Sequence, residues 1–173
     1  MGIRRSFTLI ETIVVIAVIG LVLPTIFAII FTVLQQQNKV YRMTTIKREG
    51  DYTLNIISNL IRNNARHIYS SISPDIEVCQ QIESTSPSEN LFFRDKDNQW
   101  FGFAFSYNKI SSSSAALTTD LNSSKTIVSN FSISCQKTAD YSSPTVSLSF
   151  DICFNNESGS CMHYQTKIKL RNF

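Results

Sequence analysis

The feature that most constrains this chain is an almost wholly apolar run at residues 7–34, FTLIETIVVIAVIGLVLPTIFAIIFTVL. A helix rises 1.5 Å per residue, so about 20 apolar residues cross the hydrocarbon core of a bilayer. Residues 12–34 supply that length without a charged side chain. We therefore predict a membrane-spanning helix at residues 7–34, followed by one modest domain in the rest of the 173 residues.

The flanks of this run predict its orientation. Arg4 and Arg5 precede it, and basic flanks stay on the cytoplasmic side of a membrane. The carboxy-terminal bulk is therefore expected outside the cytoplasm. A cleaved secretory signal peptide would have a shorter apolar core followed by a small-residue cleavage site. The sequence QQQNKVYR follows Leu34 and offers no such site, which favours a helix that stays attached.

Glu11 is the one carboxylate within the apolar run. A charge at the bilayer centre costs about 2.5–3.5 kcal/mol on insertion scales, and a charge near the edge costs less. Glu11 is near the cytoplasmic edge, where it is tolerable but unusual. An ionisable residue in a membrane segment indicates function and calls for a cationic partner. The plainer interpretation is a glutamate that lies among the lipid headgroups.

Residues 5–11, RSFTLIE, resemble the processing site of type IV prepilins and type II secretion pseudopilins, with a basic leader before them and a long apolar helix after them. The resemblance implies that residues 1–6 are a leader, which a membrane prepilin peptidase removes by cutting between Ser6 and Phe7. It also implies N-methylation of Phe7, and pairing of Glu11 with the Phe7 ammonium of a neighbouring subunit during assembly. Ser6 stands where the family usually has glycine, and serine is likewise small.

The same helix is predicted to continue over residues 35–70 as an amphipathic half, because apolar residues recur there at steps of three or four. The serine-rich stretch before Pro74 is expected to end it. In the membrane half, Gly20 and Pro24 are candidate kink positions, since proline removes a backbone hydrogen bond. They would let the helix bend in a filament, or they mark an ordinary kinked membrane helix.

Residues 71–173 change to the alternating pattern of strands. Residues 91–94 and 100–107 flank the turn sequence DKDN and predict a hairpin, whereas residues 111–125 are predicted to be a loop. One face of the next strand is expected to carry Ile127, Phe131, Ile133 and Cys135. We therefore predict an α+β fold of pilin-like type, in which the long helix packs on an antiparallel sheet.

The last two strands, which have the cleanest alternation, allow a test of register. Pairing Phe150 with Tyr164 brings their apolar faces together and places Cys153 opposite Cys161. Directly opposed residues have Cβ atoms about 4.5–5.5 Å apart, and a disulfide needs somewhat less. A Cys153–Cys161 disulfide is therefore a candidate.

The other two cysteines, Cys79 and Cys135, would then pair by elimination. All four cysteines follow the apolar run, and an even number on one side of a membrane suits an oxidising compartment. The alternative is free buried cysteines, which are common small core residues.

Other chemistry is not favoured by the sequence. His67 and His163 accompany cysteines that form no C-x-x-C pair, so a metal site is not expected, and His67 is placed on the helix surface. Neither a G-x-S-x-G elbow nor a glycine-rich phosphate loop occurs, so no catalytic residue and no cofactor are predicted. The formal net charge of +3 argues against a general binder of polyanions.

The resemblance thus implies a structural subunit, a minor pilin or pseudopilin of a type IV pilus, a competence pilus or a type II secretion filament. The resemblance implies three partners: prepilin peptidase, other pilin or pseudopilin subunits, and the assembly platform of the inner membrane. The expected location is the cytoplasmic membrane, crossed once, and then the filament.

Two alternatives stay open. One is an adhesin or DNA-binding tip subunit that uses Trp100 and Phe101 as contact residues, although strand alternation favours a core position for them. The other is an exported, membrane-anchored enzyme of unknown activity.

Overall fold

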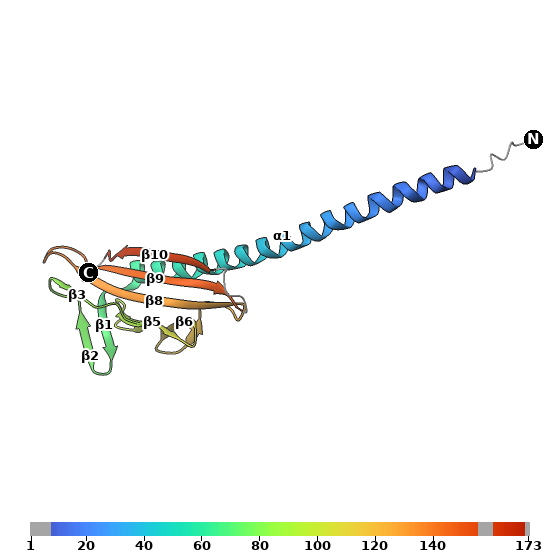
Figure 1. Cartoon of the computed structure of the whole chain (residues 1–173). Helices are drawn as coiled ribbons and strands as arrows, with labels where there is room; N and C mark the ends of the chain where they lie inside the picture. Colours follow the sequence, from blue (N-terminus) through green and yellow to red (C-terminus); the bar gives the residue numbers. More distant parts are fainter. Residues whose placement is uncertain (1–7, 156–160, 172–173) are drawn as a thin grey trace, which may run out of the picture. The chain divides into compact units, whose positions relative to one another are not determined.

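The computed structural model describes residues 8–155 and 161–171. It divides into two compact units, residues 1–41 and 42–173, each of which is described by itself. Within these described residues, one helix, α1 (Leu9–Asn64), precedes all of the strands (Figure 1). The strands are β1 (His67–Ile72), β2 (Asp75–Val78), β3 (Glu83–Ser84), β4 (Asn90–Arg94), β5 (Trp100–Ser106), β6 (Lys109–Ser114), β7 (Thr118–Asp120), β8 (Thr126–Lys137), β9 (Thr145–Phe154) and β10 (Cys161–Lys169).

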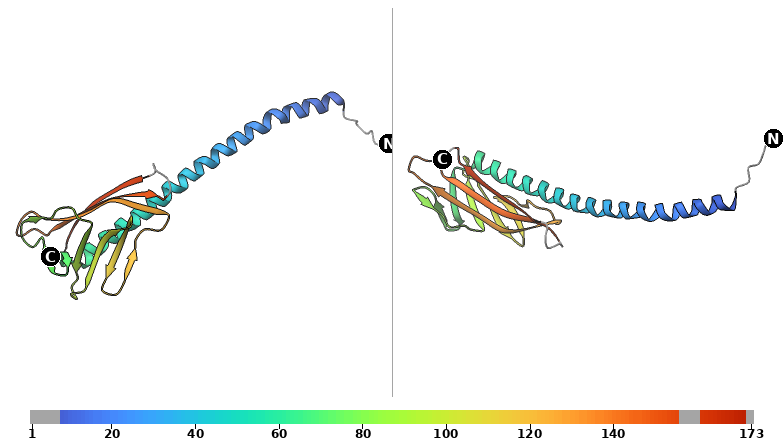
Figure 2. Two further views of the ribbon diagram at one scale, coloured as in Figure 1. Left: turned by 60° about the horizontal axis from the view of Figure 1, so that its bottom comes forward. Right: turned by 45° about the horizontal axis from the view of Figure 1, so that its top comes forward.

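The strands form two antiparallel sheets, whereas the sequence predicted one. The larger sheet has the order β2-β1-β4-β5-β6-β7, and the smaller has the order β10-β9-β8-β3. Figure 2 shows the long orange and red strands of the smaller sheet beside the green and yellow strands of the larger. The α+β class, with a long amino-terminal helix packed on antiparallel strands, is confirmed.

The helix ends at Asn64 rather than near residue 70. Two asparagines, which are weak helix formers, close it. The next residues gain more from sheet pairing, because Ile68 lies opposite both Val78 of β2 and Phe93 of β4. Ile68 lies within the predicted amphipathic half, residues 35–70, but it is a core residue of β1 instead.

One continuous hydrophobic core joins the helix to both sheets. The buried face of α1 repeats at steps of three or four, as an amphipathic helix requires. It comprises Ile46, Gly50, Thr53, Ile57 and Ile61, and Thr45 is buried beside Ile46. Large side chains from the sheets complete the core, among them Phe93, Phe103 and Phe150. The amphipathic half therefore covers the sheets as predicted, although Val40 and Met43 at its start are exposed.

The two predicted hairpins are confirmed. In the last hairpin Phe150 lies opposite Tyr164, and Cys153 lies opposite Cys161. In the earlier hairpin Phe93 lies opposite Phe101, and the turn contains Asn98 at a φ of 60°, a conformation that asparagine tolerates.

A bulge in β8 reverses which side chains face the core. The register with β9 shifts around Asn130, which has a φ of 51°. One extra residue changes the parity of a strand, so Val128 is buried and Ile127 is not. The prediction for Ile127 is therefore wrong. The other residues predicted for this face do point inward: Phe131, Ile133 and Cys135.

The predicted loop at residues 111–125 is also wrong in part. Residues 111–114 belong to β6, and residues 118–120 form β7. Serine has a weak preference for strands, but β5 offers a complete backbone ladder to β6, with Phe103 opposite Ser112. Pairing to an adjacent strand therefore overrides local composition.

Candidate functional site

The first turn of α1 holds Glu11 in a specific position. Glu11 Oε2 accepts hydrogen bonds from the backbone N–H of Thr8 (3.1 Å) and from its hydroxyl (3.2 Å). This is one half of a capping box, in which a carboxylate three residues into the helix satisfies the N-cap donor. A carboxylate there also interacts favourably with the helix dipole. Ser6 and Phe7, the predicted cleavage site, lie outside the described residues.

The apolar stretch that follows is not buried by any other part of the described chain. Its large side chains are 43–77% exposed, from Leu9 at 77% to Val33 at 43%. The helix is long and apolar enough to cross a membrane. An apolar surface of this extent in contact with water indicates a membrane or a protein partner.

Polar groups within this stretch are satisfied by the helix itself. The hydroxyls of Thr12, Thr25 and Thr32 donate to the carbonyls of Leu9, Val22 and Ala28, at 2.7, 2.7 and 2.9 Å. Such internal bonding is what a hydrocarbon environment demands, because lipid tails offer no hydrogen-bond partner.

Gly20 and Pro24 occupy linked positions in this stretch. Proline lacks an N–H and crowds the carbonyl four residues earlier, which here belongs to Gly20. The helix runs through both residues without interruption, and a Cβ at residue 20 would meet no atom within 4 Å. The kink at this pair stays a prediction.

Both predicted disulfides are present in the structure. Cys79 is bonded to Cys135, with a Cα–Cα distance of 6.4 Å, and Cys153 is bonded to Cys161, at 4.1 Å. The first bond connects the segment after β2 with β8 of the other sheet, and the second closes the last hairpin. The alternative of free cysteines is excluded in this structure.

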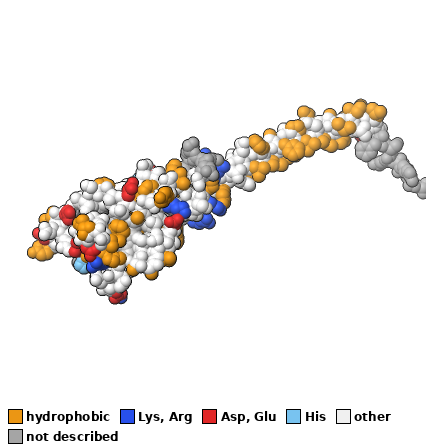
Figure 3. Space-filling view, turned by 90° about the horizontal axis from the view of Figure 1, so that it is seen from below, with side chains coloured by type: hydrophobic (Ala, Val, Ile, Leu, Met, Phe, Trp, Pro, Cys, Tyr) orange, Lys and Arg blue, Asp and Glu red, His pale blue; other side chains and the backbone are white. Residues whose placement is uncertain are grey.

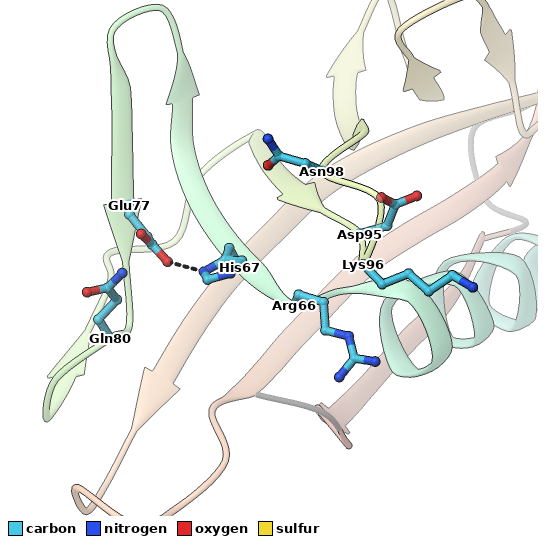
Figure 4. Close-up of a pocket in the computed structure, with 7 residues that line it drawn as sticks. All are labelled: Arg66, His67, Glu77, Gln80, Asp95, Lys96 and Asn98. Carbon is cyan, nitrogen blue, oxygen red and sulfur yellow. Dashed lines mark hydrogen bonds and ion pairs between the residues drawn. The ribbon is translucent and has the colours of Figure 1, made fainter.

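A polar hollow of about 620 Å³ opens beside the start of β1 (Figure 4). Its lining side chains come from the connection between α1 and β1, from β1, from β2 and the residues just after it, and from the β4–β5 turn. They are Arg66, His67, Glu77, Gln80, Asp95, Lys96 and Asn98.

The side chains of this hollow are largely committed to the fold. His67 Nδ1 lies 2.7 Å from a carboxylate oxygen of Glu77, and Asp95 accepts backbone hydrogen bonds from Asp97 and Gln99 in its own turn. His67 belongs to β1. The prediction that it lies on the helix surface is therefore wrong. No cluster of three potential metal ligands occurs in residues 8–155 and 161–171.

A second histidine lies in an orderly polar arrangement on the smaller sheet. His163 Nδ1 is 2.6 Å from one oxygen of Asp151, and Asn130 donates to the other at 2.6 Å. The bond from Asn130, followed by that from His163, lowers the pKa of Asp151. The arrangement links three neighbouring strands, and its evident role is to pin the β8 bulge to β9.

The aromatic residues of β5 are explained by packing. Phe101 packs against the core. Trp100 is half-buried on the opposite face, with the guanidinium of Arg94 4.2 Å from its ring centroid and Tyr69 edge-on at 4.6 Å. Arg94 is itself held by Asp75 at 2.6 Å. One face of the indole is thus covered by a fixed cation.

Comparisons of the chain with protein-family models, with curated proteins and with solved structures find no match.

Proposed function

We propose that this protein is a structural subunit of a membrane-assembled filament, a minor pilin or pseudopilin that assembles through its amino-terminal helix. The observation that carries the proposal is the exposed apolar helix with a single carboxylate in its first turn. The sequence RSFTLIE around that turn supports it independently. The α+β arrangement, in which the second half of the helix is covered by antiparallel strands, is consistent with a pilin-like fold.

The two disulfides support an exported sheet domain. Charge bias alone is weak here, because Arg4 and Arg5 precede the apolar segment while four basic residues follow it within residues 39–48. Large domains cross membranes largely regardless of such charges. Disulfides form and persist in oxidising compartments, so their presence favours the outer side of the cytoplasmic membrane.

Glu11 is proposed to exchange one partner for another during assembly. In the single chain its carboxylate accepts two hydrogen bonds from Thr8. These donors are neutral, whereas the protonated amino terminus of a neighbouring subunit carries a positive charge, so its hydrogen bond to the carboxylate also gains the attraction between opposite charges. The capping interaction keeps the carboxylate satisfied in the membrane until that stronger partner arrives.

The test is incorporation into filaments in cells that carry a pilus or pseudopilus machine. We expect Glu11→Ala to be processed and membrane-inserted like wild type, but to be strongly depleted from sheared filaments. Asp140→Ala, which removes an exposed carboxylate of the sheet domain, is the matched control and should be incorporated normally. Equal incorporation of Glu11→Ala and wild type would refute the assembly role of Glu11.

A further inference from the structure

Strand β10 forms one edge of the smaller sheet, and its length separates it from the other sheet edges. It pairs with β9 over nine successive residues without a bulge. The edge strands β2, β7 and β3 have four, three and two residues. Figures 1 and 2 show β10 in red at the margin of its sheet. Among the described strands, β10 therefore provides the long and regular edge.

The backbone groups of alternate residues in β10 point away from β9. Leu170, one step beyond the last pair of the ladder, donates its N–H to the carbonyl of Pro144 (3.1 Å). Hydrogen-bonded pairs alternate with non-hydrogen-bonded pairs, whose Cα atoms are about 4.5 Å apart. Cys153 and Cys161, at 4.1 Å, are a pair of the second type. The residues in step with Cys161 therefore direct N–H and C=O to the open edge: His163, Gln165, Lys167 and Lys169.

Within residues 8–155 and 161–171, these edge groups have no backbone hydrogen-bond partner. The side chains of the same residues are exposed. A hollow of about 540 Å³ lies beside them, lined by Gln165, Thr166 and Lys167 together with serines of β8 and β9. Proteins usually shorten such an edge or interrupt it with proline or a bulge, because an open row of backbone groups is a template for another strand. Strand β10 has neither interruption.

The charge along this edge is positive. Lys167 and Lys169 lie opposite Ser147 and Thr145 of β9, and β10 contains no acidic residue. Asp151, the one acidic residue of β9, already accepts hydrogen bonds from its own neighbours. Figure 3 shows that other parts of the domain surface carry acidic side chains (red) as well as basic ones (blue). The edge of β10 is thus complementary to a strand that carries carboxylates.

We propose that the open edge of β10 binds an extended segment of another protein, antiparallel to β10, in which every second side chain is a carboxylate. Directly opposed residues of two strands share one face of the sheet, and at hydrogen-bonded positions they exchange both N–H···O bonds. The added strand therefore sets carboxylates opposite Lys167 and Lys169 and directs the N–H groups of those same acidic residues at β10. Main-chain bonds supply affinity in this mode of recognition, and side chains supply specificity.

A second copy of the chain is a poorer partner for this edge. Pairing of β10 with β10 of another copy adds two more lysines and no carboxylate to the shared face. Like charges that meet across strands are destabilising. Lys167 and Lys169 thus oppose self-association, which is a usual role of lysine on an edge strand, and they favour an acidic strand.

The test uses the full-length chain in detergent and fluorescent peptides as long as β10, in which glutamate alternates with valine. Binding is followed by fluorescence anisotropy. A peptide with lysine in place of glutamate should bind on the order of 10-fold more weakly, because two cross-strand pairs change from opposite to like charges.

Two methylated peptides test whether the backbone carries the binding. In an added antiparallel strand the glutamate N–H groups point at β10 and the valine N–H groups point away. Methylation of the glutamate N–H groups should therefore abolish binding, whereas methylation of the valine N–H groups should preserve it.

Variants of β10 test the site. Gln165→Pro removes one N–H from the open edge and leaves the bonds to β9 in place, as proline at an edge allows. It should weaken binding of the glutamate peptide on the order of 10-fold, with the unfolding midpoint unchanged. Lys167→Glu with Lys169→Glu should reverse the preference toward the lysine peptide, and this variant tests the site even if Gln165→Pro does not fold. Arg62→Glu with Lys96→Glu makes the same charge change at exposed sites elsewhere and should keep the preference for glutamate.

Three results would overturn the proposal: equal affinity of the wild-type chain for the two charged peptides, binding that survives methylation of the glutamate N–H groups, or the same preference in both double variants. Light scattering of the chain without peptide is measured in parallel. A dimer that Gln165→Pro converts to a monomer would assign the edge to a second copy and refute the acidic partner. The inference does not depend on processing, membrane insertion or filament formation, so its failure leaves the proposed function untouched.

Discussion

The ring of Tyr164 on β10 lies directly against the backbone of Gly50 on α1. A Cβ added at residue 50 would stand 2.3 Å from two ring carbons, and the Tyr164 hydroxyl donates to the carbonyl of Lys47 at 3.2 Å. Phe150 stacks on the same ring, with centroids 5.4 Å apart. Glycine inside a helix costs about 1 kcal/mol relative to alanine, and here its absent side chain lets the edge strand pack on the helix.

This contact predicts that Gly50→Ala destabilises the protein. The substitution gains about 1 kcal/mol of helix propensity, but it overfills the contact at a cost of about 1–3 kcal/mol. A net loss of about 1 kcal/mol is expected in denaturant unfolding of the full-length chain in detergent, followed by Trp100 fluorescence.

Two further variants separate overpacking from other causes. In a Tyr164→Ala background the ring is gone, so Gly50→Ala should stabilise the protein instead of destabilising it. Gly20→Ala, where no atom lies within 4 Å, should not destabilise in either background. A destabilisation of the same size with and without Tyr164 would show that the ring is not responsible.

The contact between Glu49 and the loop before β8 predicts acid sensitivity. Burial alone would raise the pKa of Glu49, but hydrogen bonds from Ser123 and Thr126, with help from the charge of Arg48, outweigh it and lower the pKa below 4.5. Because the folded-state pKa is depressed, this carboxylate stabilises the fold above about pH 4.5, and the contribution is lost as pH falls through the folded-state value.

Glu49→Gln should therefore be less stable than wild type at neutral pH, by about 1 kcal/mol since the site is partly open to solvent. The difference should shrink as pH falls below 4.5. Unfolding of both proteins at a series of pH values checks it. Parallel stability curves with a constant gap would contradict a titrating role for Glu49.

The two disulfides should contribute unequally. The chain-entropy estimate is about 4 kcal/mol for the Cys79–Cys135 bond and about 2.5 kcal/mol for the Cys153–Cys161 bond, because their sequence separations are 56 and 8. Replacing each pair with alanine should reproduce this order in unfolding experiments. Mass measurement with and without reductant checks the pairing first, and four free thiols in the purified protein would reject both bonds.

The guanidinium of Arg94 lies over the ring of Trp100, the chain's single tryptophan, and should restrict the access of soluble quenchers to it. Arg94→Leu should increase quenching of Trp100 fluorescence by acrylamide, whereas Lys96→Leu in the neighbouring turn should not. If native Trp100 were already quenched as freely as tryptophan in solution, it would be available as a contact residue, and the tip-subunit alternative would gain support.

The sequence predicted those parts of the fold that depend on an unbroken period. Val146, Leu148, Phe150 and Ile152 alternate without interruption, so the final register and its disulfide could be read in advance. The orientation of Ile127 could not be predicted, because one extra residue at Asn130 inverts the alternation of inward and outward side chains along β8. The sequence has no glycine at this position that would indicate a bulge.

Contacts between segments that are distant in the sequence could not be predicted either. Nothing local marks Glu49 as the partner of Ser123, because that pair forms only when the domain closes on the helix. Nothing local marks Lys125 as the neighbour of Asn155 either, because that bond forms only when β8 pairs with β9. The Thr8–Glu11 spacing, by contrast, is the signature of a capping box, and it could have been recognised beside the processing motif.

The most direct test of the central claim is the amino terminus of the mature protein. The full-length chain is co-expressed with a prepilin peptidase, and its amino-terminal peptide is identified by mass spectrometry. Ser6→Gly serves as a positive control and Ser6→Leu as a blocked variant. We predict that wild type and Ser6→Gly begin at methylated Phe7 and that Ser6→Leu keeps its leader. A wild-type chain that retains residues 1–6, or that is cut elsewhere, would contradict the account.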